Sequence, residues 1–325
     1  MEANILSKGG IVDVKLQNVY KQSFLNRAKK DFKRNKYVYF MAIPVLLFFL
    51  VFCYLPMYGA LIAFQDYNIV DGFFGSEWVG LHWFKKFFTD YTFIRILKNT
   101  LILSFTNILW GFPAPIILAL LLNEVKSQKY KRCVQTVVYI PHFISVVVIC
   151  GLIKDFLGRD GIITMLLTNF GLENTNLLSI PEYFRTIYVG SGIWQEIGWG
   201  SIIYLSALTG IDPQLYEAAK IDGAGRLRQT WNITIPGIMS TIIVMLILRI
   251  GQIMSLGYEK VMLLYTPIIY EKADIISTYV YRVGLLEGMQ FSYSTAIGLF
   301  NSVINLLLVV IANTISNKFT GDGLW

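Results

Sequence analysis

One stretch near the middle of the chain is the most informative about the fold: Asp212-Pro-Gln-Leu-Tyr-Glu217-Ala-Ala-Lys-Ile-Asp222-Gly-Ala-Gly-Arg-Leu-Arg-Gln-Thr-Trp231-Asn-Ile-Thr-Ile-Pro236. Asp212 is a favourable helix N-cap and Pro213 suits the first helical position, which predicts a short helix to about Ile221. Gly223 then predicts a turn, because glycine tolerates a positive φ. A second short helix is predicted to stop before Pro236. The stretch therefore predicts a compact helix–turn–helix.

Long apolar runs flank this stretch on both sides. Of the 325 residues, 55% are hydrophobic and 15% are charged, whereas ordinary soluble domains carry roughly 25% charged residues. This composition excludes a water-soluble enzyme, a nucleic-acid-binding protein and a disulfide-stapled secreted module. Three cysteines lie in or beside apolar segments and are predicted to pack as small apolar residues. The chain is predicted to be an integral membrane protein.

Six segments are long and apolar enough to cross a bilayer, which takes about 20 residues per helix. Prolines inside or beside several of them predict kinks, which either surround a path or only shape the packing. The predicted fold class is therefore all-α, a polytopic membrane bundle of six transmembrane helices. The predicted spans cover about residues 37–64, 99–122, 134–153, 184–208, 236–256 and 294–315.

The distribution of charge predicts which ends of the spans face the cytoplasm. Seventeen Lys and Arg residues lie in the tails and the loops 123–133 and 209–235, against ten in the alternate set of segments. Positively charged segments stay on the cytoplasmic side, so both termini are predicted to be cytoplasmic. The net charge of +7 is then a topology signal, and no nucleic acid is predicted as a partner. The basic tail is predicted to contact lipid headgroups of the cytoplasmic membrane.

These boundaries predict three parts of the chain. Residues 1–36 form a basic cytoplasmic tail, residues 37–316 form the transmembrane domain with its loop 209–235, and residues 317–325 form a second cytoplasmic tail. No phosphate-binding loop or hydrolase motif is present. With only His82 and His142 as histidines, no metal site is predicted. Energy must then come from an ion gradient or from a partner subunit.

The loop 209–235 resembles the EAA motif of ABC importer permeases, a glutamate and two alanines followed by an aspartate, a glycine and a later proline. Ile235 replaces the usual leucine before Pro236, and Trp231 stands where another aromatic residue is common. Of three further stretches, the first resembles the external segment that precedes the second span in sugar permeases. The other two resemble the oligosaccharide and polysaccharide branch of the maltose-permease-like family, which includes alginate-type permeases. The resemblance covers roughly residues 37–316. Those three stretches are Gly80–Phe84, Tyr139–Ser145 and Trp194–Leu205.

The resemblance implies the fold of a type I ABC importer permease and a set of partners. These are a second homologous permease, two ABC ATPase subunits, an extracytoplasmic solute-binding protein and a carbohydrate substrate. ATP and Mg²⁺ would bind the ATPase subunits, and no cofactor is expected on this chain. By position, the loop would dock on an ATPase subunit through a polar anchor, a turn and small residues that allow close packing. The residues carried over are Glu217, Ala218, Ala219, Asp222, Gly223 and Ala224.

A candidate substrate path is predicted from polar and aromatic residues inside the spans. Charged groups there are costly and usually functional, and the two present are Glu196 and Arg249. They either contact solute in a water-filled cavity or pair with each other or with the second permease. The other candidates either line the path or serve helix packing and the membrane interface. They are Trp194, Trp199, Tyr204, Asn301 and Asn305.

The predicted function is therefore that of a transport subunit and not of an enzyme. It would be the permease of an ATP-driven importer that moves an oligosaccharide or polysaccharide, acidic ones such as alginate included. The alternatives are an ABC permease for a non-sugar solute and an ion-coupled carrier working alone. Inverted halves and broken helices at the midplane would favour the carrier.

Overall fold

The structure is a computed structural model that describes residues 30–171, 174–321, 323 and 324. Most of the predicted basic tail, 1–36, lies outside these residues. The chain divides into two compact units, residues 1–60 and 61–325. The described part is almost wholly helical, with one small antiparallel sheet.

The first unit contains most of the predicted first span. Helix α3 (Lys36–Phe48) contains Pro44 and continues into the π-helical turn η1 (Phe49–Tyr54). The 3₁₀-helical segment η2 (Leu55–Phe64) then crosses the boundary into the second unit. A proline removes one helical hydrogen bond, and a local change of helix type restores pairing around it. The run Lys36–Phe64 is long and apolar enough to cross a membrane, which confirms the position predicted for the first span.

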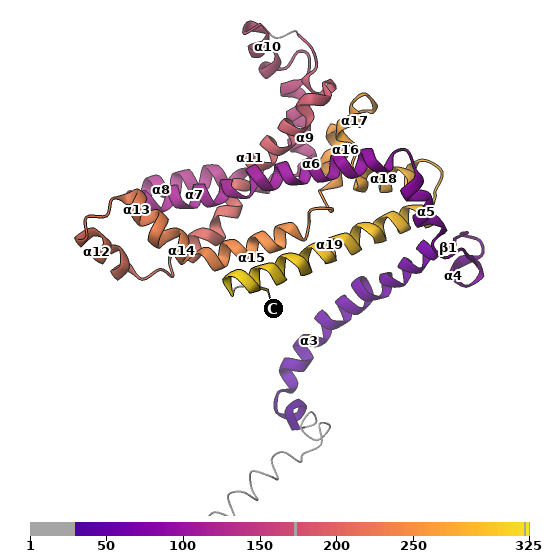
Figure 1. Cartoon of the computed structure of the whole chain (residues 1–325), viewed down its shortest axis with the longest axis horizontal. Helices are drawn as coiled ribbons and strands as arrows, with labels where there is room; N and C mark the ends of the chain where they lie inside the picture. Colours follow the sequence, from indigo (N-terminus) through magenta and orange to yellow (C-terminus); the bar gives the residue numbers. More distant parts are fainter. Residues whose placement is uncertain (1–29, 172–173, 322, 325) are drawn as a thin grey trace, which may run out of the picture. The chain divides into compact units, whose positions relative to one another are not determined.

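The second unit is built around long helices that lie side by side (Figure 1). Helix α11 (Pro181–Leu208) packs against α6 (Phe93–Gly111) and α7 (Pro113–Glu124), which follow each other in one 32-residue run. Helix α19 (Phe291–Thr320) packs against α15 (Met239–Ile250). These helices coincide with the predicted second, fourth, fifth and sixth spans.

The third predicted span, residues 134–153, is sharply bent, in agreement with the kink that its proline predicts. Helix α8 (Gln128–Tyr139) and η3 (Ile140–Phe143) are bent by 98° from the run that begins with α9 (Val146–Leu157). Pro141 lacks the N–H that would continue the hydrogen-bond ladder. Ser145 then starts α9 by accepting a hydrogen bond from the N–H of Val148. In Figure 1, α9 and α10 lead away from the long helices.

The fifth span differs from its prediction, because the helix before it does not stop at Pro236. Helical backbone runs from α13 (Arg226–Gln229) through η5 (Thr230–Thr234) to α14 (Ile235–Gly237), and the bend of 62° falls after Gly237. The π-helical turn η5 shifts the hydrogen-bond register just before the proline, so the missing N–H leaves no gap. The span proper is therefore α15 and begins at Met239.

By length and composition, three of the described helices can cross a membrane, and five can if each bent pair is one span. The remaining predicted span is α11, which is long enough at 28 residues but carries polar groups.

Short elements connect these helices. The strands pair Gln65 with Trp78 and Asp66 with Glu77. The connecting elements are β1 (Gln65–Asp66), α4 (Gly72–Gly75), β2 (Glu77–Trp78), α5 (His82–Thr89), α10 (Ile162–Asn169), η4 (Leu177–Ser179), α12 (Pro213–Ile221), α16 (Tyr258–Leu264), η6 (Pro267–Ile269), α17 (Tyr270–Ala273), α18 (Ile276–Tyr281) and η7 (Arg282–Leu286).

Helix α11 approaches α8 so closely that one contact admits only glycine. A Cβ added at Gly198 would lie 2.0 Å from the carbonyl oxygen of Val138. On the same helix, a Cβ at Gly190 would meet nothing within 4 Å. Close backbone contact of this kind is how helices associate in membranes, where burial of apolar surface gives little driving force.

We expect Gly198→Ala to lower the thermal stability of the purified permease by about 1–3 kcal/mol, the usual cost of overpacking. The matched variant Gly190→Ala should be neutral or slightly stabilising, because alanine is the better helix former. Thermal unfolding in detergent measures both. Equal midpoints for the two variants would contradict the tight contact with Val138.

Candidate substrate cavity and coupling loop

A cavity of about 260 Å³ lies between the middle of α6, the middle of α11 and the segment that follows α15. Along α6 and α11 it falls between two apolar clusters, one containing Leu103 and Tyr188 and the other containing Ala119 and Tyr204. The cavity therefore interrupts the packed core partway along the long helices.

Three charged side chains line this cavity: Glu196 from α11, Arg249 from the last turn of α15, and Lys260 from α16. Within the described part of the chain, neither Arg249 nor Lys260 has a carboxylate within 4 Å, since no salt bridge includes them. Glu196 and Arg249 thus do not pair with each other, which was one of the two readings that the sequence left open.

Glu196 pairs instead with a histidine from the broken third span. Its Oε2 lies 3.0 Å from Nδ1 of His142, whose ring stacks on Trp199 with 4.4 Å between centroids and 3° between planes. His142 is thereby a hydrogen-bonding and packing residue. Among the described residues, the two cations at the cavity without a carboxylate within 4 Å are Arg249 and Lys260.

Lys260 is a site residue that sequence reasoning missed. It lies in a segment predicted to be an external loop, yet its side chain is almost fully buried, with its Nζ over the ring of Tyr188 at 5.2 Å. Helix α16 packs on α9 and carries this lysine to the cavity. No local pattern around Lys260 marks it, because its burial depends on how α16 folds back against the bundle.

The other predicted path residues do not line this cavity. Tyr204 is buried in an apolar cluster, and Trp194 is half exposed. Asn305 accepts a hydrogen bond from the N–H of Met254 and donates one to Ser255, so it fixes the segment after α15. Asn301 borders a separate cavity of about 390 Å³ beside α18 and α19, where its Oδ1 is buried without a hydrogen-bond partner.

The predicted helix–turn–helix is present in loop 209–235. Helix α12 begins at Pro213, and the Asp212 carboxylate accepts a hydrogen bond from the N–H of Gln214 at 2.9 Å, as an N-cap does. Gly223 has φ +75°, which confirms the predicted turn. Figure 1 places α12 and α13 at the end of the second unit opposite α5 and α18.

The surface of this loop is apolar to an unusual degree for a cytosolic segment. None of the α12 residues is buried, and Ile221 is 87% exposed. Leu215, Leu227 and Trp231 are also exposed. Four large apolar side chains are therefore exposed within one short loop. Glu217 lies on this same exposed helix and, among the described residues, makes no ion pair.

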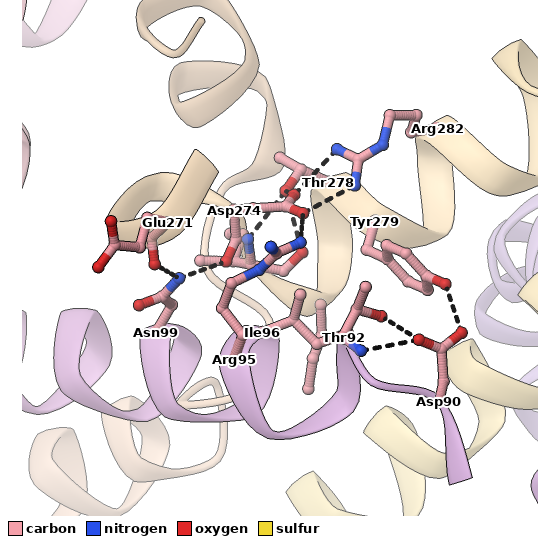
Figure 2. Close-up of polar contacts among 12 residues, drawn as sticks. Asp90, Thr92, Arg95, Ile96, Asn99, Glu271, Asp274, Thr278, Tyr279 and Arg282 are labelled. Carbon is pink, nitrogen blue, oxygen red and sulfur yellow. Dashed lines mark hydrogen bonds and ion pairs between the residues drawn. The ribbon is translucent and has the colours of Figure 1, made fainter. Parts of the chain in front are cut away.

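At the end of the second unit opposite α12, a buried ion pair links the residue that follows α17 to the first residue of η7 (Figure 2). Asp274 is fully buried, and its two carboxylate oxygens accept hydrogen bonds from Nη1 and Nη2 of Arg282 at 3.0 and 2.7 Å. Thr278 donates a further bond to the carboxylate. Asn99 of α6 donates to the backbone carbonyls of Glu271 and Asp274. Together these bonds fix the segment 271–282 on α6.

Comparison with known proteins agrees with this arrangement. The sequence profile of the family "binding-protein-dependent transport system inner membrane component" matches residues 101–320. The chain is 49% identical over 308 residues to the polygalacturonan/rhamnogalacturonan transport system permease protein YteP of Bacillus subtilis (strain 168), covering 94% of this chain and 96% of YteP. It is also 49% identical over 294 residues to protein LplB of the same organism, covering 90% and 92%.

A solved structure shares the fold over most of the chain. One chain of a bacterial alginate ABC transporter, crystallised with an alginate pentasaccharide-bound periplasmic protein, superposes with a TM-score of 0.83 at 45% identity. The match covers 91% of this chain and 99% of that one. Fold and site thus define a multi-pass transport permease of the inner membrane. The chain belongs to the binding-protein-dependent transport system inner membrane component family.

We expect Asp274→Asn to destabilise the protein by about 3 kcal/mol, because it removes the buried counter-charge of the Arg282 guanidinium and leaves only the exposed carboxylate of Glu287. Glu271→Gln, three residues away on an exposed side chain, is the matched control and should behave as the parent. Thermal inactivation of the assembled transporter reads out both. A loss no larger than that of Glu271→Gln would show that the pair does not hold this region.

Proposed function

We propose that this chain is one of two permease subunits in an ATP-driven importer of carboxylate-bearing oligosaccharides or polysaccharides. A second, homologous permease would complete the translocation path, and two ABC ATPase subunits would bind and hydrolyse ATP with Mg²⁺. An extracytoplasmic solute-binding protein would deliver the saccharide. This chain would carry the solute and perform no catalysis.

The exposed apolar surface of loop 209–235 supports coupling to an ATPase subunit. A helix that is capped at Asp212 and ends in a glycine turn is rigid enough to transmit a movement, whereas a flexible loop is not. Its exposed side chains, Leu215 and Ile221 among them, would be covered by the ATPase. In this proposal Glu217 is the polar anchor, and Ala218 and Ala219 allow close packing. Gly223 forms the turn, with Asp222 and Ala224 on either side of it in the sequence.

The observation that carries the substrate class is the pair of unpartnered cations, Arg249 and Lys260, at the cavity. An unpaired charge in a low-dielectric site is costly, and a carboxylate on the solute compensates for it with charge-assisted hydrogen bonds. The similar proteins named above for the transport of polygalacturonan and of alginate carry solutes of this kind. Serine, asparagine and glutamine side chains in the same cavity would serve the sugar hydroxyl groups.

The test of this function is reconstitution of the chain with its second permease, ATPase subunits and binding protein in proteoliposomes. ATPase stimulation and uptake are measured with matched neutral and uronic oligosaccharides. Stimulation by uronic oligosaccharides well above that by neutral ones is expected. Stimulation by neither set would refute the substrate class.

We expect Glu217→Lys to abolish uptake while the chain still folds and inserts, because the substitution places a cation where the anchor carboxylate stood. Gly223→Asp should act in the same direction, since its φ of +75° strains any other residue. Gln128→Lys, exposed in the other cytoplasmic loop, is the control and should transport at the parent rate. Parent-rate uptake by Glu217→Lys would remove the coupling role from this loop.

We expect Arg249→Gln and Lys260→Gln each to weaken stimulation by uronic oligosaccharides roughly tenfold, since a hydrogen bond to a charged group contributes about 1.5–3 kcal/mol. Stimulation by neutral oligosaccharides should change little. Lys154→Gln, an exposed lysine away from the cavity, is the control. Equal losses for neutral and uronic sugars would argue against carboxylate binding here.

A further inference from the structure

A second polar cavity lies at the external end of the second unit and shares no residue with the first. Its volume is about 430 Å³, and it lies between α5, the start of α6, α17, η7 and the start of α19. Sites for small molecules have volumes of about 300–1,000 Å³. By the topology of the spans, this cavity opens on the side from which solute arrives.

The carboxylates at this cavity are already satisfied by the chain. Asp90 accepts four hydrogen bonds, two from Thr92 and one each from the hydroxyl groups of Tyr279 and Tyr293. These bonds outweigh the cost of burial and hold the pKa of Asp90 below its usual value. Arg282 binds both oxygens of Asp274 and also pairs with Glu287 at 3.5 Å. Among the described residues, the carboxylates at this cavity therefore have partners within the chain and do not need a bound cation.

Arg95 of α6, in contrast, is not satisfied (Figure 2). Among the described residues its side chain makes no hydrogen bond, and its Nε is buried without a partner. The one ion pair that Arg95 makes within the described part of the chain is long, 3.9 Å from Nη2 to an oxygen of Asp274 that already accepts from Arg282 at 2.7 Å. The guanidinium lines the cavity with most of its donors free.

A second cation of the same cavity also lacks a carboxylate. Lys86 of α5 places its Nζ 5.0 Å from the ring centroid of Trp83 and 4.8 Å from that of Tyr293, and 3.5 Å from Oε1 of Gln290. Cation–π contacts hold the ammonium group in place without neutralising it. Arg95 and Lys86 therefore lack an anionic acceptor, and one anion that contacts both would supply it.

We propose that this cavity is an external binding site for a uronate unit of an acidic saccharide. The carboxylate of the sugar accepts from Arg95 in the two-pronged geometry that guanidinium groups favour, and Lys86 adds a second donor. Tyr91 and Tyr270, also on the cavity wall, offer ring surface to the sugar. The inference rests on the proposed function for its substrate class and adds a site distinct from the membrane cavity.

The test measures equilibrium binding of digalacturonate, with galactobiose as the neutral probe, to the assembled permease–ATPase complex in nanodiscs without the binding protein. The parent complex should bind digalacturonate and not galactobiose. Arg95→Gln should weaken one class of sites at least fivefold, and Lys86→Gln should weaken the same class less. Lys98→Gln, exposed on α6 one turn from Arg95, and Lys85→Gln, exposed on α5, are the matched controls and should bind as the parent.

Each other result of this test overturns the external site in a recognisable way. If Arg249→Gln removes all digalacturonate binding while Arg95→Gln and Lys86→Gln bind as the parent, the external site is refuted and the membrane cavity stands. If Arg95→Gln leaves digalacturonate binding intact but weakens docking of the solute-binding protein, measured separately on the same nanodiscs, the guanidinium serves an acidic side chain of that protein instead. If the parent binds neither probe, the external site fails, and the uptake assay with the binding protein decides the proposed function separately.

Discussion

The structure depends on one constraint, that backbone polar groups within the bilayer must find partners inside the protein. Prolines at 56, 141 and 236 each remove an N–H from a predicted span. A π-helical turn precedes Pro56 and another precedes Pro236, and a break capped by Ser145 follows Pro141. The two larger bends are products of this accommodation, and one of them carries His142 to Glu196.

Charge is arranged differently at the two polar sites of the second unit. At the end opposite α12, Asp274 and Arg282 neutralise each other and link the residue after α17 to η7. At the membrane cavity, Glu196 is paired while Arg249 and Lys260 are not. In a structural ion pair each charge is neutralised by the other, whereas a site that binds a charged ligand contains charges without a counter-charge in the protein. By that criterion the cation pair Arg249 and Lys260 supports the ligand site proposed at the membrane cavity, and Arg95 supports the one proposed at the external cavity.

Local signals allowed a good part of this to be predicted from the sequence. The cap at Asp212, the turn at Gly223 and the positions of most spans depend on neighbouring residues, and all are confirmed. The bend at residues 143–146 and the continuation of helix through Pro236 depend on how the backbone re-registers its hydrogen bonds. Lys260 and the pairing of His142 with Glu196 depend on tertiary contacts, the latter between residues 54 apart, and no pattern of single residues reveals them.

One amide side chain links the fifth and sixth spans mechanically. Asn305 of α19 grips the backbone at Met254 and the hydroxyl of Ser255, immediately beside residues that wall the membrane cavity. A Cβ added at Gly251 would lie 2.3 Å from the side chain of Val309, so the two spans also touch without clearance there. We therefore expect α19 and this stretch of the cavity wall to move together. A tilt of α19 would therefore change the shape of the membrane cavity through these contacts.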